Sequence, residues 1–268
     1  MITEHTKIYG IIGDPVSQVR APEVFNELFA RNNYDAVFVP MQVAPEGLEA
    51  AVASFRAMEN LIGFIATVPH KKAMASLCDE LGEASRAIGA VNAVRREADG
   101  RLIGNMYDGA GFVAGLRKQG HDPAGCRALL LGAGGAAAAI AFALMEAGVA
   151  SLFISNRTPS KAEEIVARIG NYFPNRRIRA GAPDPTGHDL VINATSLGMK
   201  ATDPLPIDPA LLTPNMTVAE IIMKPEVTPI LAAAKARGCA VHYGRHMLDE
   251  QVAMWMGHWL PNQVAMGT

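Results

Sequence analysis

The sequence predicts an α/β fold arranged in two domains. Short apolar runs alternate with segments of helical periodicity from Ile8 to Trp259, which is typical of strand–helix–strand units. A glycine-rich turn follows one of these apolar runs near the middle of the chain, at Gly132–Ala137. The length of 268 residues suits one large or two small domains with ample core.

The first half of the chain begins this alternation. Pro22 suits a first helical turn, and the apolar residues that follow it recur at helical spacing. Pro69 ends the strand expected from Leu61 to Val68, because proline cannot donate to a strand ladder. We expect a helix from Pro22, a second helix over 48–58, and strands over 8–12, 36–39, 61–68, 90–94 and 102–103.

The second half repeats the pattern with more regular spacing. We expect strands over 128–131, 151–155, 189–192, 217–221 and 240–242, and helices over 109–118, 161–169, 229–237 and 247–259, with an alanine-rich helix after Gly135. We place the first domain at 1–107 and expect the C-terminal helix region, 245–268, to complete it. The second domain is expected over 108–244.

Composition excludes several classes of function. The formal net charge is −2 without a basic cluster, so we expect no nucleic acid partner. No apolar run approaches the ~18–20 residues of a membrane span, and the N-terminus lacks the pattern of a signal peptide. The three cysteines and seven histidines are scattered, which predicts no protein-bound metal and no disulfide framework. We expect a cytoplasmic protein, either a monomer or a homodimer.

The glycine-rich turn predicts a dinucleotide site. Gly132, Gly134 and Ala137 fit the spacing G-x-G-x-x-G/A, and the turn lies between a strand and a helix. Gly132 permits the tight turn, and Gly134 lets the backbone approach a pyrophosphate. The following helix presents free N–H groups to phosphate oxygens. The expected cofactor contacts here are Gly132, Ala133, Gly134, Gly135 and Ala136.

The end of the next strand favours NADP over NAD. NAD sites commonly place an acidic residue there, whereas this chain has Asn156-Arg157-Thr158, with Lys161 close behind. Arg157 offers a planar donor fork to a 2′-phosphate, and Lys161 adds a further charge. The alternative is that both cations are solvent-exposed side chains at the start of a helix. NAD is also an alternative cofactor.

A third strand leads into Asn193-Ala194-Thr195-Ser196-Leu197-Gly198-Met199. Ligands of open α/β folds bind at the carboxyl edge of the sheet, where this segment begins. We expect Thr195, Ser196 and Met199 to line the nicotinamide end of the cofactor. The alternative is an ordinary polar turn.

Two residues of the first half suit carbinol–ketone chemistry. Lys71 follows a buried strand, and Asp108 lies at the expected domain junction. A lysine beside a nicotinamide can move a hydroxyl proton while hydride moves to the cofactor. An aspartate that pairs with the lysine orients it and shapes its pKa.

The order of motifs resembles the shikimate/quinate dehydrogenase family over nearly the whole chain. The matching segments are Gly13-x-Pro15, Thr67-Val68-Pro69-x-Lys71, Gly89-Ala90-Val91-Asn92, Asp108-Gly109-x-Gly111-Phe112, Gly132-Ala133-Gly134-Gly135-Ala136, Asn156-Arg157-Thr158, Asn193-Ala194-Thr195-Ser196-x-Gly198-Met199, and Met247-Leu248 with Gln251. The resemblance implies an N-terminal α/β substrate-binding domain and a Rossmann-type NADP-binding domain. It also implies an oxidoreductase that acts on a shikimate- or quinate-like cyclic polyol, as in aromatic amino acid biosynthesis.

The same resemblance implies roles for individual residues. Lys71 and Asp108 match the catalytic pair of the family. Asn92, Asp108 and Gln251 match residues that contact the hydroxyls of the substrate ring, and Thr67 matches a residue that lines the same pocket. Gly244 is added to the expected cofactor contacts.

One departure from the family pattern bears on the substrate. Shikimate-specific members carry a Ser-x-Ser pair that holds the substrate carboxylate, whereas this chain has Val19 and Ala21 at those positions. Hydrogen bonds to a charged group are worth ~1.5–3 kcal/mol each, so we expect weak or altered shikimate activity. Either Arg20, Ser17 or Gln18 replaces this anion contact, or the pocket takes a polyol without the carboxylate. Two further alternatives are an NAD-dependent quinate-type dehydrogenase and a regulator that binds NAD(P) with reduced catalysis.

Overall fold

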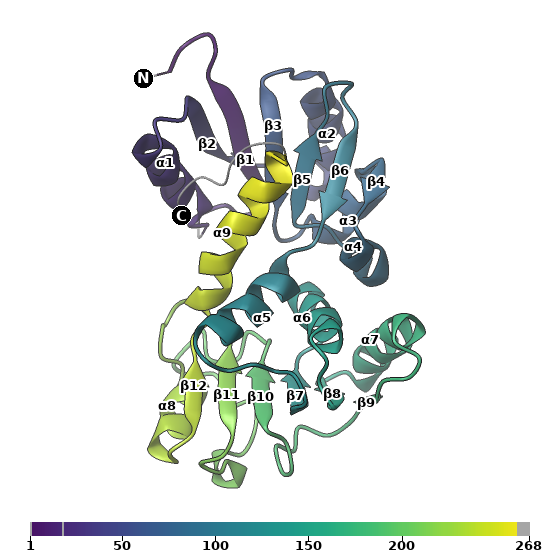
Figure 1. Cartoon of the computed structure of the whole chain (residues 1–268), viewed down its shortest axis with the longest axis vertical. Coiled ribbons are helices and arrows are strands. Elements are labelled where there is room, and N and C mark those ends of the chain that lie inside the picture. Colours follow the sequence, from purple (N-terminus) through teal and green to yellow (C-terminus); the bar gives the residue numbers. More distant parts are fainter. Residues whose placement is uncertain (1, 18, 262–268) are drawn as a thin grey trace. The chain divides into compact units, whose positions relative to one another are not determined.

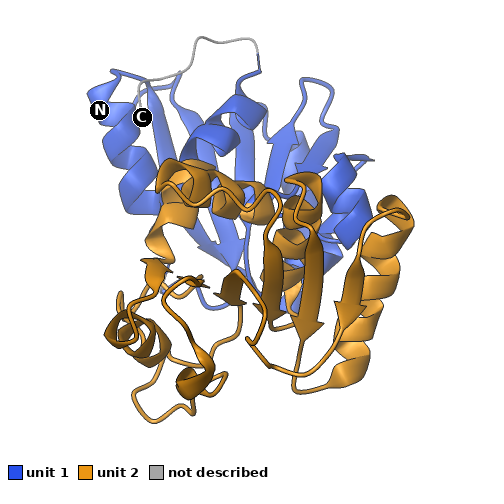
Figure 2. Cartoon of the chain, turned by 60° about the horizontal axis from the view of Figure 1, so that its bottom comes forward, with its two compact units in different colours: residues 1–107, 252–268 blue, residues 108–251 orange. Residues whose placement is uncertain are grey.

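The computed structural model describes residues 2–17 and 19–261, and the chain divides into two compact units (Figures 1 and 2). Unit 1 contains residues 1–107 and 252–268, and unit 2 contains residues 108–251. Each unit has its own six-stranded sheet flanked by helices. The expected α/β fold class is therefore confirmed.

The sheet of unit 1 is mixed, with the order β2-β1-β3-β5-β6-β4. Parallel pairs join β1 to β2, β1 to β3 and β4 to β6, while β5 runs antiparallel to both β3 and β6. The strands are β1 (Lys7–Gly13), β2 (Ala36–Gln42), β3 (Leu61–Ala66), β4 (Glu80–Leu81), β5 (Ala93–Arg96) and β6 (Leu102–Asn105).

The helices of unit 1 pack an apolar core against this sheet. They are α1 (Ala21–Arg31), the 3-10 turn η1 (Pro45–Gly47), α2 (Leu48–Ala57), α3 (Lys71–Leu77), α4 (Glu83–Ile88) and the second part of α9 (Arg245–Trp259). Trp259 of α9 lies 5.1 Å from the ring of Tyr9 and 5.3 Å from that of Phe25. Its indole N–H donates to the carbonyl oxygen of Val94 over 3.0 Å. Residues at the two ends of the sequence therefore share one core.

The sheet of unit 2 is entirely parallel, with the order β12-β11-β10-β7-β8-β9. Its strands are β7 (Arg127–Leu131), β8 (Ser151–Ser155), β9 (Ile178–Ala180), β10 (Leu190–Asn193), β11 (Thr217–Glu220) and β12 (Ala240–His242). The first strand in sequence, β7, lies between β8 and β10, so the order of strands reverses there. In doubly wound sheets, ligands bind outside the carboxyl ends of the strands at this switch point.

The helices of unit 2 are α5 (Asp108–Lys118), α6 (Gly135–Glu146), α7 (Pro159–Tyr172), the 3-10 turn η2 (Pro209–Leu211), α8 (Pro229–Ala236) and the first part of α9. Helix α6 is apolar on almost every side, and eight of its residues are buried, which is typical of a helix inside a domain. Among the described residues, no helix is both long and apolar enough to cross a membrane.

The expected elements differ from the observed ones mainly at their ends. The strand expected over 61–68 ends at Ala66, and the one expected over 90–94 begins only at Ala93. Helices α3 and α4 and strands β4 and β9 were not expected. These elements have between two and seven residues, too few to show a clear period of hydrophobicity.

Candidate functional site

The glycine turn after β7 lies at the switch point of the unit 2 sheet. The Gly132 N–H donates to the Ser155 carbonyl oxygen at the end of β8 over 2.7 Å. Gly132 has a φ of +114°, and a Cβ at this position would lie 2.7 Å from the Ala194 carbonyl oxygen. Both observations require glycine here. The turn therefore joins the carboxyl ends of three neighbouring strands.

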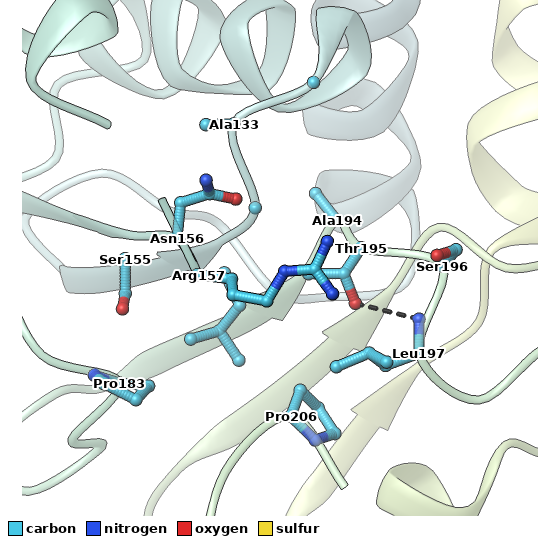
Figure 3. A pocket seen from close by; sticks show the side chains of 13 residues that line it. Ala133, Ser155, Asn156, Arg157, Pro183, Ala194, Thr195, Ser196, Leu197 and Pro206 are labelled. Atoms are coloured by element: carbon cyan, nitrogen blue, oxygen red, sulfur yellow. Dashed lines mark hydrogen bonds between the residues drawn. The ribbon is translucent and has the colours of Figure 1, made fainter. Parts of the chain in front are cut away.

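A cavity of about 580 Å³ opens beside this turn (Figure 3). Its lining comes from the ends of β7, β8 and β10 and from loops that follow them. It consists of Leu131, Gly132, Ala133, Gly134, Ser155, Asn156, Arg157, Pro183, Ala194, Thr195, Ser196, Leu197 and Pro206. Seven of the expected cofactor contacts are among these residues.

The start of α6 leaves room for a phosphate group. Gly134 caps this helix, and a Cβ built on Gly134 or Gly135 would meet no atom within 4 Å. The first N–H groups of a helix have no partner inside the helix, and its dipole attracts anions. This open backbone next to the cavity fits a pyrophosphate. Gly135 and Ala136 belong to the first turn of α6 and lie outside the cavity lining.

The end of β8 brings a cation to the cavity. Arg157 is exposed and belongs to the lining, and Figure 3 shows its guanidinium among the labelled lining residues. The side-chain amide of Asn156 donates to the carbonyl oxygen of Thr158 over 2.9 Å, which fixes the turn that carries Arg157. Thr158 and Lys161, the two other residues expected here, are exposed and lie outside the lining.

The segment after β10 forms another part of the lining. Thr195 Oγ1 accepts a hydrogen bond from the Leu197 N–H over 3.0 Å, drawn as the dashed line in Figure 3. Thr195 and Ser196 belong to the cavity lining, whereas Met199 is half exposed and lies outside it. Gly244 is also outside it, because it packs closely against the backbone of Ile221 and Ile222.

Sequence reasoning missed a buried carboxylate near this segment. Glu220 ends β11, has no exposed surface, and accepts a hydrogen bond from the side chain of Asn193 over 3.1 Å. Burial raises the pKa of Glu220 to about 7. The available signal was a glutamate that ends an apolar strand, but the sequence does not show its partner.

Three of the residues expected at the substrate site lie near one another in unit 1, because backbone hydrogen bonds join their segments. The Ala66 N–H donates to the Asn92 carbonyl oxygen over 3.1 Å, and the Val91 N–H donates to that of Lys71 over 2.8 Å. These bonds bring Lys71, Asn92 and the segment that contains Thr67 together. Asn92 is buried, and its side-chain oxygen accepts from the Tyr107 N–H over 2.9 Å.

The turn before Lys71 is held firmly. The Thr67 N–H donates to the Ile12 carbonyl oxygen over 3.0 Å, and the His70 N–H donates to that of Thr67 over 2.7 Å. The buried His70 ring contacts the Val43 carbonyl oxygen through Nε2 at 2.8 Å. Lys71 therefore begins α3 from a fixed backbone, with a half-buried side chain.

Asp108 and Gln251 form a buried pair within unit 2. The Gln251 side-chain amide donates to Asp108 Oδ1 over 2.9 Å, and both side chains are about 4% exposed. Gly111 makes this approach possible, because a Cβ there would lie 2.6 Å from Gln251 Cγ. The sequence analysis assigns both residues to the substrate site, and in the structure their side chains are joined by this hydrogen bond.

The segment before α1 carries the departure from the family pattern. Ala21 is buried at the start of α1, Val19 is partly buried, and the side chains of Arg20 and Ser17 are exposed. Gln18 lies outside the described residues. Within the described residues, no group of three or more His, Cys, Asp or Glu side chains is arranged to hold a metal ion.

Comparisons with known proteins agree with this architecture. Residues 11–94 match the family model "Shikimate dehydrogenase substrate binding domain", and residues 116–198 match "Shikimate / quinate 5-dehydrogenase". The Rubrobacter xylanophilus protein named "Shikimate dehydrogenase (NADP(+))" is 42% identical to this chain, over 92% of this chain and 88% of that protein.

Two solved structures are similar over almost the whole chain. The ligand-free 5-ketofructose reductase of a Gluconobacter strain has a TM-score of 0.88 and 37% identity, covering 97% of this chain and 95% of the other. A shikimate dehydrogenase in complex with NADP⁺ has a TM-score of 0.92 and 31% identity, covering 100% and 93%. On this evidence, the chain belongs to the shikimate/quinate dehydrogenase family.

Proposed function

We propose that the protein is an NADP(H)-dependent oxidoreductase that interconverts a carbinol and a ketone on a small polyhydroxylated substrate. The observation that carries this proposal is the cavity at the switch point of the unit 2 sheet. Its lining combines Gly132 and Gly134 of the glycine turn with Arg157 at the end of β8. The relative from Rubrobacter and the shikimate dehydrogenase solved with NADP⁺ support NADP as the cofactor.

The lining residues suit the parts of NADP(H). The open backbone at Gly134 and the first N–H groups of α6 are proposed to hold the pyrophosphate. Arg157 is proposed to bind the 2′-phosphate, because a guanidinium matches the geometry of phosphate oxygens and no carboxylate ends β8 to repel them. The nicotinamide ring, when bound, accepts or supplies the hydride.

The proposed roles of the other residues follow the family resemblance. Lys71 is proposed to take the hydroxyl proton when the carbinol is oxidised and to return it when the ketone is reduced. Asp108 is proposed to orient Lys71, and the buried bond from Gln251 fixes the Asp108 carboxylate for that role. Thr67, Asn92 and Gln251 are proposed to bind substrate hydroxyls.

The substrate class has two candidates. A shikimate- or quinate-like cyclic polyol is favoured by the family models and by the Rubrobacter relative. A neutral polyhydroxy ketone is favoured by Val19 and Ala21, which offer no side-chain hydroxyl for a carboxylate. The similarity to a 5-ketofructose reductase supports this second candidate. Arg20 is exposed and remains the proposed alternative anion contact.

A substrate screen tests this proposal. The purified protein is assayed for absorbance of reduced nicotinamide with shikimate, quinate and 5-ketofructose, each with both NADP(H) and NAD(H). We expect turnover with the NADP form and a lower kcat/KM for shikimate than for the preferred substrate. Tight NADPH binding without turnover of any polyol or hydroxy acid would instead favour a regulator.

We also propose a cytoplasmic location. Cys78, Cys126 and Cys239 are all free thiols, which suits a reducing compartment. The proposed oligomeric state is a monomer or a homodimer, which sedimentation of the full chain distinguishes.

A further inference from the structure

We infer that Glu220 is a positioning residue for the cofactor cavity, because it fixes the side chain of Asn193 and thereby the loop 194–197. The inference rests on the proposed function, since it assumes that NADP(H) occupies this cavity. Glu220 itself is absent from the cavity lining and acts through the residues that it holds.

The Glu220 carboxylate is surrounded by hydrogen-bond donors. Oε2 accepts from Asn193 Nδ2 over 3.1 Å and from Thr228 Oγ1 over 3.0 Å. Oε1 accepts from the peptide N–H groups of Ile221 over 3.2 Å and Ile222 over 3.4 Å. A fully buried carboxylate is retained only when such bonds replace its hydration.

These bonds determine which way the Asn193 amide points. Its Nδ2 donates to Glu220 and also to the Leu197 carbonyl oxygen over 3.0 Å. Its Oδ1 therefore faces Thr195, where it accepts from the peptide N–H over 3.1 Å and from Oγ1 over 2.6 Å. Reversal of the amide would place a donor against both of these donors. A carboxylate at Glu220 excludes that reversed state.

The loop held in this way forms part of the cavity. Ala194, Thr195, Ser196 and Leu197 all belong to the lining. The Ala194 carbonyl oxygen also faces Gly132, where a Cβ would lie only 2.7 Å away. A displacement of the loop therefore changes two parts of the lining, the loop itself and the glycine turn.

The role requires the ionised form of Glu220. The groups facing it from β10, from the segment after β11 and from the start of α8 are Asn193, two peptide N–H groups and Thr228, and none of them titrates near neutral pH. Protonation replaces an acceptor with a donor in a ring of donors. Because burial raises the pKa of Glu220 to about 7, this change falls near neutral pH.

The test compares NADPH dissociation constants of the unmodified protein and the Glu220→Gln variant, about two pH units above and below that pKa. Above it, we expect the variant to bind about tenfold more weakly, since one misplaced buried donor has an effect of this order. Below it, we expect the ratio of the two constants to approach one, because wild-type Glu220 is then protonated. The ratio at each pH cancels the titration of the cofactor's own 2′-phosphate.

Two further variants keep the test decisive. Glu220→Asp retains the charge on a shorter side chain, so we expect intermediate affinity that still depends on pH. Thr228→Val removes one bond to Glu220 and the cap of α8 but leaves the Asn193 bond, so we expect lower stability with affinity within about twofold of wild type. Thermal unfolding of each variant measures the loss of stability.

Several results would overturn the inference. If the NADPH dissociation constants of Glu220→Gln and the unmodified protein are nearly equal at both pH values, Glu220 does not position the loop. An equal weakening at both pH values, or an equal weakening in Thr228→Val, shows general damage to the fold. Failure of the unmodified protein to bind NADPH overturns the proposed function instead, so the two failures are distinct.

Discussion

Gly132 and Ala194 lie so close together that the cofactor turn has no room for a side chain. A Cβ on Gly132 would lie 2.7 Å from the Ala194 carbonyl oxygen, and the φ of Gly132 is +114°. We expect Gly132→Ala to lower the free energy of unfolding by roughly 1–3 kcal/mol, since steric contact and backbone strain act together. Urea unfolding measures this, and an unchanged midpoint would contradict the close contact.

Gly134 provides the matched control for this substitution. Its φ is −83°, and a Cβ there would meet no atom within 4 Å. We expect Gly134→Ala to keep or slightly raise stability, by about 0.4–1 kcal/mol, because alanine restricts the unfolded chain. Its NADPH affinity should nevertheless fall about tenfold or more, since the methyl group enters the space proposed for the pyrophosphate. Calorimetric titration with wild-type affinity would exclude that assignment.

Arg157 should decide the preference between the two nicotinamide cofactors. It lines the cavity, whereas Lys161, four residues further on, does not. We expect Arg157→Ala to weaken NADPH binding about 10- to 100-fold and to leave NADH binding nearly unchanged, because only NADPH carries the 2′-phosphate. Lys161→Ala should change both constants by no more than about twofold. Equal effects of the two substitutions would assign Arg157 to the solvent-exposed start of α7.

Lys71 should affect turnover without affecting the cofactor site. Lys71→Met keeps the length of the side chain but removes the group proposed to carry the proton. We expect kcat to fall by at least about 10²-fold while the Kd for NADPH stays unchanged, because the cavity lies within unit 2. Lys72→Met, at the exposed neighbouring position, is the control and should retain activity. Steady-state kinetics with the preferred substrate measures both, and near-normal turnover in Lys71→Met would remove the assignment.

Hydroxyls at positions 19 and 21 should improve the use of a carboxylated substrate. We expect Val19→Ser with Ala21→Ser to raise kcat/KM for shikimate about 10- to 100-fold, through new hydrogen bonds to a charged group. The same variant should gain nothing with a neutral polyhydroxy ketone, which serves as the internal control. A parallel change with both substrates would show that the two positions do not read the carboxylate.

His242 predicts a loss of stability in acid. It is fully buried, both ring nitrogens lack a partner among the described residues, and its ring packs against those of Phe112 and His246. Burial, together with smaller effects of the nearby His246 and His121, lowers the pKa of His242 from an ordinary 6.5 to about 3. Below pH 6.5 the unfolded chain therefore takes up a proton that the fold refuses until about pH 3.

The expected slope is about 1.4 kcal/mol of unfolding free energy per pH unit in that window. His242→Phe should remove this pH dependence. The free energy of unfolding of the variant should therefore rise relative to that of the wild type as the pH falls from 6.5 toward 3. Glu220 has the opposite sign, because its raised pKa favours the fold as the pH falls through 7. Chemical unfolding measures both proteins at each pH, and the difference between their unfolding free energies cancels the contribution of Glu220. If the two curves of unfolding free energy against pH are parallel, the prediction is contradicted.

The sequence predicts the cofactor region better than its surroundings, for a physical reason. The glycine turn, Arg157 and Thr195 each follow directly from a strand end, and parallel strands bring their carboxyl ends to one edge of the sheet. The Glu220–Asn193 bond depends on which strands are neighbours, and a local pattern does not encode that order. Lys161 lies close to Arg157 along the chain but outside the cavity lining, so its proposed contact with the cofactor stays a prediction.

Helix α9 bears on the order in which the two units fold during synthesis. Residues 108–251 of unit 2 are continuous in the sequence, whereas the core of unit 1 includes Trp255 and Trp259, more than 140 residues after Tyr107. Domains generally fold from the N-terminus as they leave the ribosome. Here the N-terminal half is synthesised first, but Phe25 and Tyr9 lack their contacts with Trp255 and Trp259 until α9 has been synthesised. Unit 1 therefore cannot complete its core during synthesis until the whole of unit 2 has also been translated.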